Sequence, residues 1–206
     1  VEALDGRVVG VDDRGRVDLD QLAATLADIG PHVGVVSVML ANNETGVIND
    51  LDAVAAVVRT HEPEVPRVPV HTDAVQAAAW MDLSRHAAAA DLVSVSGHKL
   101  GGPKGIGALV VRQHTPIRPL VLGGGQERGR RSGTSNVAGI VGLAAVRQGG
   151  LGRRGWGLVG HDVFQSPVEA IALRRCRTCA TLVRPTSHHR AERDALAAEL
   201  KALREK

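Results

Sequence analysis

A lysine inside a turn of small residues is the first feature of this sequence that could carry out covalent chemistry. Lys99 directly follows Ser96-Gly97-His98, and a glycine-rich stretch then leads into an apolar segment. A lysine amine can form a Schiff base with a carbonyl compound. Hydroxyl and imidazole groups beside backbone N–H donors can hold a phosphate. The stretch therefore predicts a site for a phosphorylated carbonyl cofactor.

A second group of polar residues follows another short apolar run. Val68-Pro69-Val70 leads into His71, and Asp73 and Gln76 come shortly after it. A carboxylate can pair with a pyridinium nitrogen, so that the ring acts as an electron sink. Lysine, aspartate, glutamine, serine and histidine in this arrangement are typical of a pyridoxal 5′-phosphate (PLP) site.

These motifs, together with segments 40–46 and 131–134, resemble those of the cysteine desulfurases, which are class V, fold type I PLP enzymes. The resemblance extends from about Val8 to about Arg147 and keeps the family's order of motifs. It implies the large domain of a fold type I transferase, a homodimer, and L-cysteine as substrate. In that family the sulfur passes to a cysteine thiolate and alanine is left. The sulfur then serves iron–sulfur clusters or thio-modification of tRNA, with a sulfur-acceptor protein as a further partner.

The resemblance implies a role at the cofactor ring for four residues. Lys99 would be the Schiff-base lysine, and Asp73 would pair with the ring nitrogen. Gln76 would bond the phenolic oxygen of the ring, and Asn43 would lie beside the ring and this oxygen.

Three more residues are implied at the cofactor phosphate. Ser96 and His98 would bind it within one subunit, whereas Thr134 would reach the phosphate of the other subunit in a dimer. His98 is also a candidate for assisting Lys99 in proton transfer.

The same residues have structural interpretations. Asp73 could be the N-cap of a helix that extends to Ala79, which is compatible with cofactor binding. Asn43 is a common turn former, and His98 could simply satisfy a turn. The joint pattern of motifs along the chain favours the PLP interpretation.

Composition and charge limit the classes of function. The chain has 206 residues, of which 44% are hydrophobic and 23% charged, enough for one sizeable core. No apolar run approaches the roughly 20 residues of a membrane helix, and we expect a cytoplasmic protein with no membrane partner. The formal net charge of +3 comes from the basic segment 149–206, where the arginines are scattered and aromatic residues are scarce. We therefore expect no binding of nucleic acid.

Apolar, β-branched runs alternate with helical patterns along the chain. The predicted strands are Arg7–Val11, Val33–Ala41, Val68–His71, Leu92–Val95 and Gly107–Val111. The predicted helices begin at N-caps Asp18 or Asp20, Asp50 and Asn136, with a further helix over Ala77–Ala90. This alternation predicts an α/β fold with a mostly parallel sheet flanked by helices. Ligands of such sheets bind at the carboxyl ends of the strands, where the candidate residues fall.

The chain divides near residue 148. Residues 1–148 are predicted to be a partial PLP-binding large domain. Residues 149–206 are a basic, poorly matched segment that ends in a predicted helix over Ala191–Lys206. Within it, 149–185 shows little periodicity, which fits either an insertion or a shifted reading frame.

The two cysteines are the remaining candidates for chemistry. Cys176-x-x-Cys179, with His188 and His189 downstream, offers four zinc ligands in principle. Adjacent histidines suit a tetrahedral site poorly, and no thioredoxin-like strand precedes the cysteines. We interpret them as incidental thiols and predict no metal site.

Parts of the family's pattern have no counterpart in this sequence. No segment matches the family's sulfur-accepting cysteine, its substrate-binding arginine or its ring-stacking histidine. We therefore expect a partial chain that is weakly active or inactive by itself. Two alternatives stay open: another class V PLP enzyme, such as a selenocysteine lyase or an aminotransferase, and a non-catalytic truncated remnant.

Overall fold

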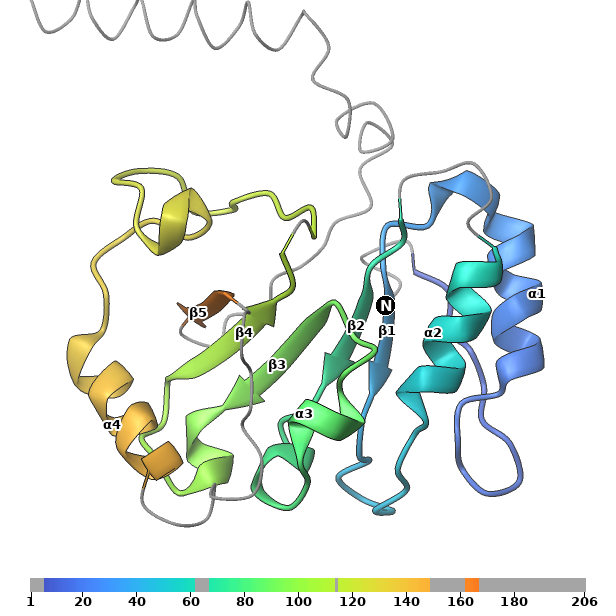
Figure 1. The fold of residues 1–206 in the computed structure, drawn as a ribbon, viewed down its shortest axis with the longest axis horizontal. Helices are drawn as coiled ribbons and strands as arrows, with labels where there is room; N and C mark the ends of the chain where they lie inside the picture. Colours follow the sequence, from blue (N-terminus) through green and yellow to red (C-terminus); the bar gives the residue numbers. More distant parts are fainter. Residues whose placement is uncertain (1–5, 62–66, 114, 149–161, 167–206) are drawn as a thin grey trace, which may run out of the picture.

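Five strands form one sheet in the computed structural model of the chain, which describes residues 6–61, 67–113, 115–148 and 162–166 (Figure 1). The strands lie side by side in chain order. They are β1 (Val36–Met39), β2 (Val70–Asp73), β3 (Leu92–Ser96), β4 (Gly107–Val111) and β5 (Asp162–Ser166).

The sheet is parallel where it carries the candidate site and antiparallel beyond it. β1, β2 and β3 run parallel, while β4 is antiparallel to β3 and β5 is antiparallel to β4. Parallel neighbouring strands must be joined by a crossover of a dozen or more residues, usually a helix. Only the short connection over residues 97–106 joins β3 to β4, so these two strands are antiparallel. The predicted α/β class is confirmed, and the parallel pairing holds for the strands that precede the candidate residues.

The helices begin where the sequence predicts their caps. The Asp18 carboxylate accepts hydrogen bonds from the backbone of residues 20 and 21 at the start of α1, and Asp50 does the same for residues 52 and 53 in α2. Asn136 accepts from the Gly139 amide in α4. The longer helices are α1 (Leu19–Ile29), α2 (Leu51–Thr60) and α4 (Val137–Gln148). The short ones are η2 (Gly30–His32), η3 (Ala77–Ala79), α3 (Leu83–His86), η4 (Gly97–Leu100) and η5 (Glu127–Gly129).

The predicted strand Arg7–Val11 is wrong. Only Val11 pairs, in an isolated bridge to Val17, across a turn that the Asp12 carboxylate holds by accepting from the amides of Arg14 and Arg16. The local turn leaves too few residues to extend a ladder.

The predicted continuous helix over Ala77–Ala90 is also wrong. The chain forms η3, and Asp82 then caps the separate short helix α3 by accepting from the Ser84 amide at 2.9 Å. Ala87, Ala89 and Ala90 are buried, because the chain turns there into the core and leads directly into β3. Packing outweighs the helical preference of alanine.

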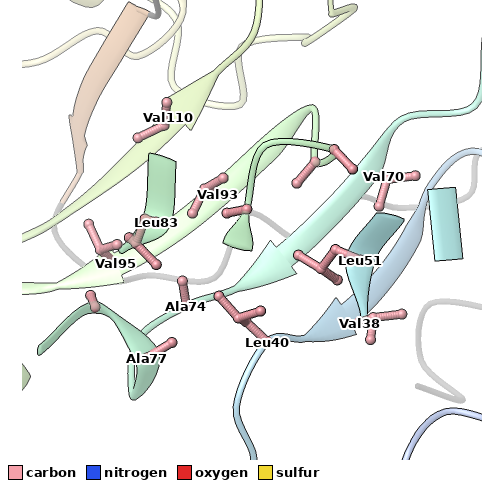
Figure 2. Close-up of a cluster of buried hydrophobic side chains, with 14 of the residues drawn as sticks. Val38, Leu40, Leu51, Val70, Ala74, Ala77, Leu83, Val93, Val95 and Val110 are labelled. Carbon is pink, nitrogen blue, oxygen red and sulfur yellow. The ribbon is translucent and has the colours of Figure 1, made fainter. Parts of the chain in front are cut away.

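One face of the sheet carries the main core. Val38, Val70, Val93, Val95 and Val110 point to the same cluster, which Figure 2 shows together with side chains from α2 and α3. Burying each such side chain contributes about 1.5–3 kcal/mol relative to leaving it exposed. This packing holds the strands in a fixed register.

The opposite face is more polar. Successive strand residues alternate between faces, so Ser37, His71, Asp73 and Ser94 point away from the main core. A smaller apolar cluster around Leu92, Val111 and their neighbours lies toward the β4 side.

Several predictions lie outside the described residues. They include the helix Ala191–Lys206 and the side chains of Cys176, Cys179, His188 and His189. From segment 149–206 the structure describes only β5, which the sequence pattern did not reveal. The division of the chain near residue 148 stays a prediction. Within the described ranges, no helix combines the length and apolarity that crossing a bilayer requires.

Candidate active site

Asp73 occupies the central position at the carboxyl edge of the three parallel strands. Its Cα pairs with Met39 of β1 on one side and with Ser94 of β3 on the other. Its backbone oxygen accepts from the Leu40 amide at 2.9 Å. Asp73 is the last residue of β2, which ends two residues later than the predicted strand Val68–His71. The loop after β1 and the turn after β3 therefore flank it.

The loop after β1 displays Asn43 while its neighbour shapes the turn. The side-chain oxygen of Asn42 accepts from the amides of Glu44 and Thr45, both at 2.9 Å. Leu40, just before the loop, is fully buried and anchors it. Asn43 itself is exposed. The turn-forming interpretation therefore applies to Asn42, which leaves Asn43 available for a ligand.

Asp73 begins a turn rather than a helix. Its Oδ1 accepts from the Val75 amide at 2.8 Å. The following η3 has Gln76 at its N-cap position, without a side-chain cap bond. Among the described residues, the second carboxylate oxygen of Asp73 has no hydrogen-bond partner. Asp73 and Gln76 are both half-buried, a depth at which each can face a ligand.

The lysine turn is held tightly at both of its ends. Gly97 lies so close to Ile106 that an added Cβ would approach the Ile106 Cγ2 atom to 2.8 Å. Leu100 is buried, and Gly101 ends the turn at φ 81°, in the left-handed region that favours glycine. Lys99, between these anchors, is exposed. Packing thus fixes the backbone that carries the lysine.

Ser96 and His98 form a pair beside this lysine. The Ser96 Oγ lies 2.8 Å from His98 Nδ1, and Ser96 is only 3% exposed. The bond orients the imidazole and leaves Nε2 as its second polar atom. A hydroxyl and an imidazole at the start of a turn form a suitable site for an anion.

Helix α4 supports the lysine turn from outside. Gly142 of α4 lies against Pro103, and an added Cβ there would meet the Pro103 ring at 2.5 Å. Val146 of the same helix approaches Gly102. Figure 1 shows α4 beside this end of the sheet.

Thr134 is exposed and is not joined to the other candidates. Within the described ranges, no hydrogen bond or ion pair links it to Asp73, Ser96 or Lys99. The loop before it contains Glu127 and Arg128 at φ 52° and 58°, an uncommon conformation for residues other than glycine. A role for Thr134 in a neighbouring subunit stays a prediction.

His71 is a polar residue to which sequence reasoning assigned no role. Its Nδ1 lies 2.8 Å from Ser37 Oγ, and its Nε2 lies 2.8 Å from Ser94 Oγ. Burial lowers the pKa of His71, and the nearby charge of Asp73 offsets this only in part. The sequence did contain a signal for this role. Ser37, His71 and Ser94 are polar residues at strand positions that face the same side of the sheet.

The sequence of residues 3–148 matches the family described as aminotransferase class V. The chain belongs to this family. Among its class V relatives, a cysteine desulfurase of Gluconacetobacter diazotrophicus is 47% identical over 166 residues, 81% of this chain and 37% of that protein. The cysteine desulfurase NifS of Azotobacter vinelandii is 43% identical over 141 residues, 68% of this chain and 33% of that protein.

Solved structures agree with the class V assignment. A NifS-like protein superposes with a TM-score of 0.60 at 43% identity, covering 68% of this chain and 37% of that one. A structure described as SspA in complex with cysteine gives 0.58 at 33% identity, covering 70% and 40%. The chain spans about a third of the length of the curated relatives that it matches.

The donors at the sheet edge fit PLP, the cofactor that membership of class V implies. A carboxylate, a lysine amine and a hydroxyl–imidazole pair match the ring nitrogen, the carbonyl and the phosphate of this molecule. The carboxylate lies at the end of β2, whereas the lysine and the hydroxyl–imidazole pair lie at the end of β3 and in the turn after it. The chemistry of these donors therefore fits one edge of the cofactor ring and its phosphate.

Proposed function

We propose that this class V chain carries the lysine-bearing half of a PLP site in a cysteine desulfurase. The observation that supports it most is the register of three parallel strands, which sets Asp73 between the Asn43 loop and the Lys99 turn. The identity of 43–47% to proteins named cysteine desulfurases supports the specific activity.

In this proposal each residue acts on a defined part of the cofactor. Lys99 would bind the carbonyl carbon, and Asp73 would hold a proton on the ring nitrogen. Asn43 and Gln76 would serve the phenolic oxygen. When bound, PLP supplies an electron sink for the substrate's Cα. The Lys99 amine would also move protons at the substrate's Cα, and His98 would assist it.

The remaining polar residues hold the phosphate. Ser96 and His98 provide a hydroxyl and an imidazole within one subunit. Thr134 serves the phosphate bound by a second copy of the chain, so the proposal includes a homodimer. The exposure of Thr134 supports this, because a residue that reaches another subunit must lie at the surface of its own.

The proposed substrate is L-cysteine. Its sulfur passes to a thiol, which becomes a persulfide, and alanine is the other product. The solved structure described as SspA in complex with cysteine supports this choice of amino acid. A sulfur-acceptor protein, delivery to iron–sulfur clusters or tRNA, and a cytoplasmic location are further parts of the proposal.

PLP binding by the purified chain is the first test, because it does not require turnover. After dialysis against PLP, the wild-type chain should show the absorbance band of a lysine Schiff base, whereas Lys99→Ala should show at most the band of the free PLP aldehyde. Lys104→Ala, which alters an exposed lysine five residues further on, should keep the absorbance. A Schiff-base band that survives in Lys99→Ala would overturn the proposal.

Substrate choice is tested separately on PLP-loaded protein. L-cysteine, L-selenocysteine and an amino acid with a keto-acid acceptor should be offered in parallel. Formation of alanine from cysteine together with a persulfide supports the desulfurase. Exclusive reaction with selenocysteine, or transfer of the amino group, would identify a different class V enzyme.

A further inference from the structure

An imidazole bridges three strands directly behind the candidate ring-nitrogen carboxylate. His71 lies at 2.8 Å from both Ser37 of β1 and Ser94 of β3. Ser37 is the register partner of His71, whereas Ser94 is the register partner of Asp73. On the β3 side the imidazole therefore bonds Ser94, which lies opposite Asp73 rather than opposite His71.

The bridge leaves neither ring nitrogen without a partner. A neutral imidazole has one donor and one acceptor, and a serine hydroxyl can serve either. Serines on both sides therefore satisfy either tautomer while holding the ring plane in one orientation. The two hydrogen bonds favour an orientation in which the ring faces the neighbouring strands.

The charges around His71 favour its neutral form. Burial lowers the pKa of the imidazole, and Asp73, on the same strand, raises it by less. The neighbouring strands contribute hydroxyls from Ser37 and Ser94 rather than charges. Arg67 and Asp91, at the starts of β2 and β3, are paired with each other at 2.6 Å.

We propose that Ser37, His71 and Ser94 form a positioning network for Asp73 within the site. This rests on the proposed function, because it assigns the network to the carboxylate that faces the PLP ring nitrogen. A cation at position 71 would compensate the charge of Asp73 and repel a protonated ring nitrogen. The bridged, neutral imidazole supports the end of the strand. Because it carries no charge, it leaves the negative charge of Asp73 available to the ring nitrogen of the cofactor.

The network can be observed without cofactor. In chain labelled with ¹⁵N-histidine and free of PLP, the His71 ring should be neutral at pH 7, with both nitrogens showing the chemical shifts of hydrogen-bonded atoms. Ser94→Ala should remove the hydrogen bond at Nε2 and change the shift of this nitrogen more than that of Nδ1. Ser84→Ala, at an exposed serine that bonds Asp82 at 2.6 Å, is the matched control and should change nothing. A charged or freely exchanging His71 in the wild-type chain would overturn the proposal.

The effect on the site is read from the pyridine nitrogen of ¹⁵N-labelled PLP. In His71→Gln, which stays neutral, this nitrogen should remain protonated over the wild-type pH range. In His71→Lys a cation about two strand residues from Asp73 should lower the midpoint of its titration by about one pH unit. Should His71→Lys not fold, Ser94→Ala provides the second measurement, with a smaller shift in the same direction.

The outcomes separate the two proposals. A wild-type chain that binds no PLP contradicts the proposed function, and the network falls with it. The network alone is contradicted if PLP binds but its nitrogen titrates as in the wild type in both folded His71→Lys and Ser94→Ala. A shift in Ser84→Ala as large as that in Ser94→Ala would also overturn it, because the effect would then not depend on the bridge.

Discussion

Asp73 and Ser94 are register partners on adjacent parallel strands, and the amide that follows Asp73 donates to the Ser94 carbonyl oxygen at 3.0 Å. This pairing ties the end of β2 to the strand that leads into the lysine turn. A shift of register by one residue would turn the carboxylate to the other face of the sheet. The geometry of the site therefore depends on strand pairing as much as on the residues themselves.

Reduction of the PLP-loaded chain with borohydride should place the pyridoxyl group on Lys99. Gly97 and Leu100 anchor the backbone on either side of this lysine, whereas Lys104 follows Pro103 further along the turn. Peptide mapping by mass spectrometry is the measurement. A pyridoxyl group on Lys104 would show that the register of the whole site is wrong.

Replacing Asp73 by asparagine should slow the reaction of bound PLP with an amino acid far more than it weakens PLP binding. The amide keeps the shape and the hydrogen bond to Val75, but it lacks the charge that favours a protonated ring nitrogen. Stopped-flow absorbance and a binding titration give the two quantities. Equal losses in both would mean that Asp73 only shapes the turn.

Gly97→Ala should destabilise the chain by about 1–3 kcal/mol, because the added methyl overlaps the Ile106 side chain and the backbone around it. Urea unfolding measures this free energy. Gly34→Ala is the control, since nothing lies within 4 Å of an added Cβ there, and it should be neutral or stabilising by up to about 1 kcal/mol. Equal effects in the two variants would contradict the tight packing of the lysine turn.

The stability of the wild-type chain should fall more steeply with decreasing pH than that of His71→Gln. Because burial lowers the pKa of His71, the unfolded chain takes up a proton at this residue below about pH 6.5 while the folded chain stays neutral. The contribution of His71 to the free energy of unfolding is therefore present above this pH. It is lost as the pH falls toward the pKa of His71 in the folded chain. Urea unfolding between pH 5 and 8 measures the difference. His32→Gln, at an exposed histidine in η2, should retain the wild-type slope.

Local patterns were sufficient for the elements that depend on neighbouring residues. The aspartates at positions 18 and 50 cap helices because their side chains reach amides two and three residues away. The β-branched run around Val36–Met39 forms a strand with one buried face for the same kind of local reason. The motifs around Asn43, Asp73, Lys99 and Thr134 jointly indicated the family, because each is a short continuous stretch that can be recognised without the fold.

Elements that depend on distant contacts were not predictable in this way. The alanines after Asp82 have high helix propensity, but the core takes them up before a long helix can form. β5 has no pattern that marks it, and only its pairing with β4 makes it a strand.

By itself, the sequence determined the residue types of the site and the helix caps, since both depend on short stretches of chain. The tertiary structure decided which of these residues meet. The Ser37–His71–Ser94 bridge joins residues 34 and 23 positions apart, and it exists only because three strands pair in one register. That register is set by the summed burial of side chains from the whole sheet and its covering helices, which no single segment contains.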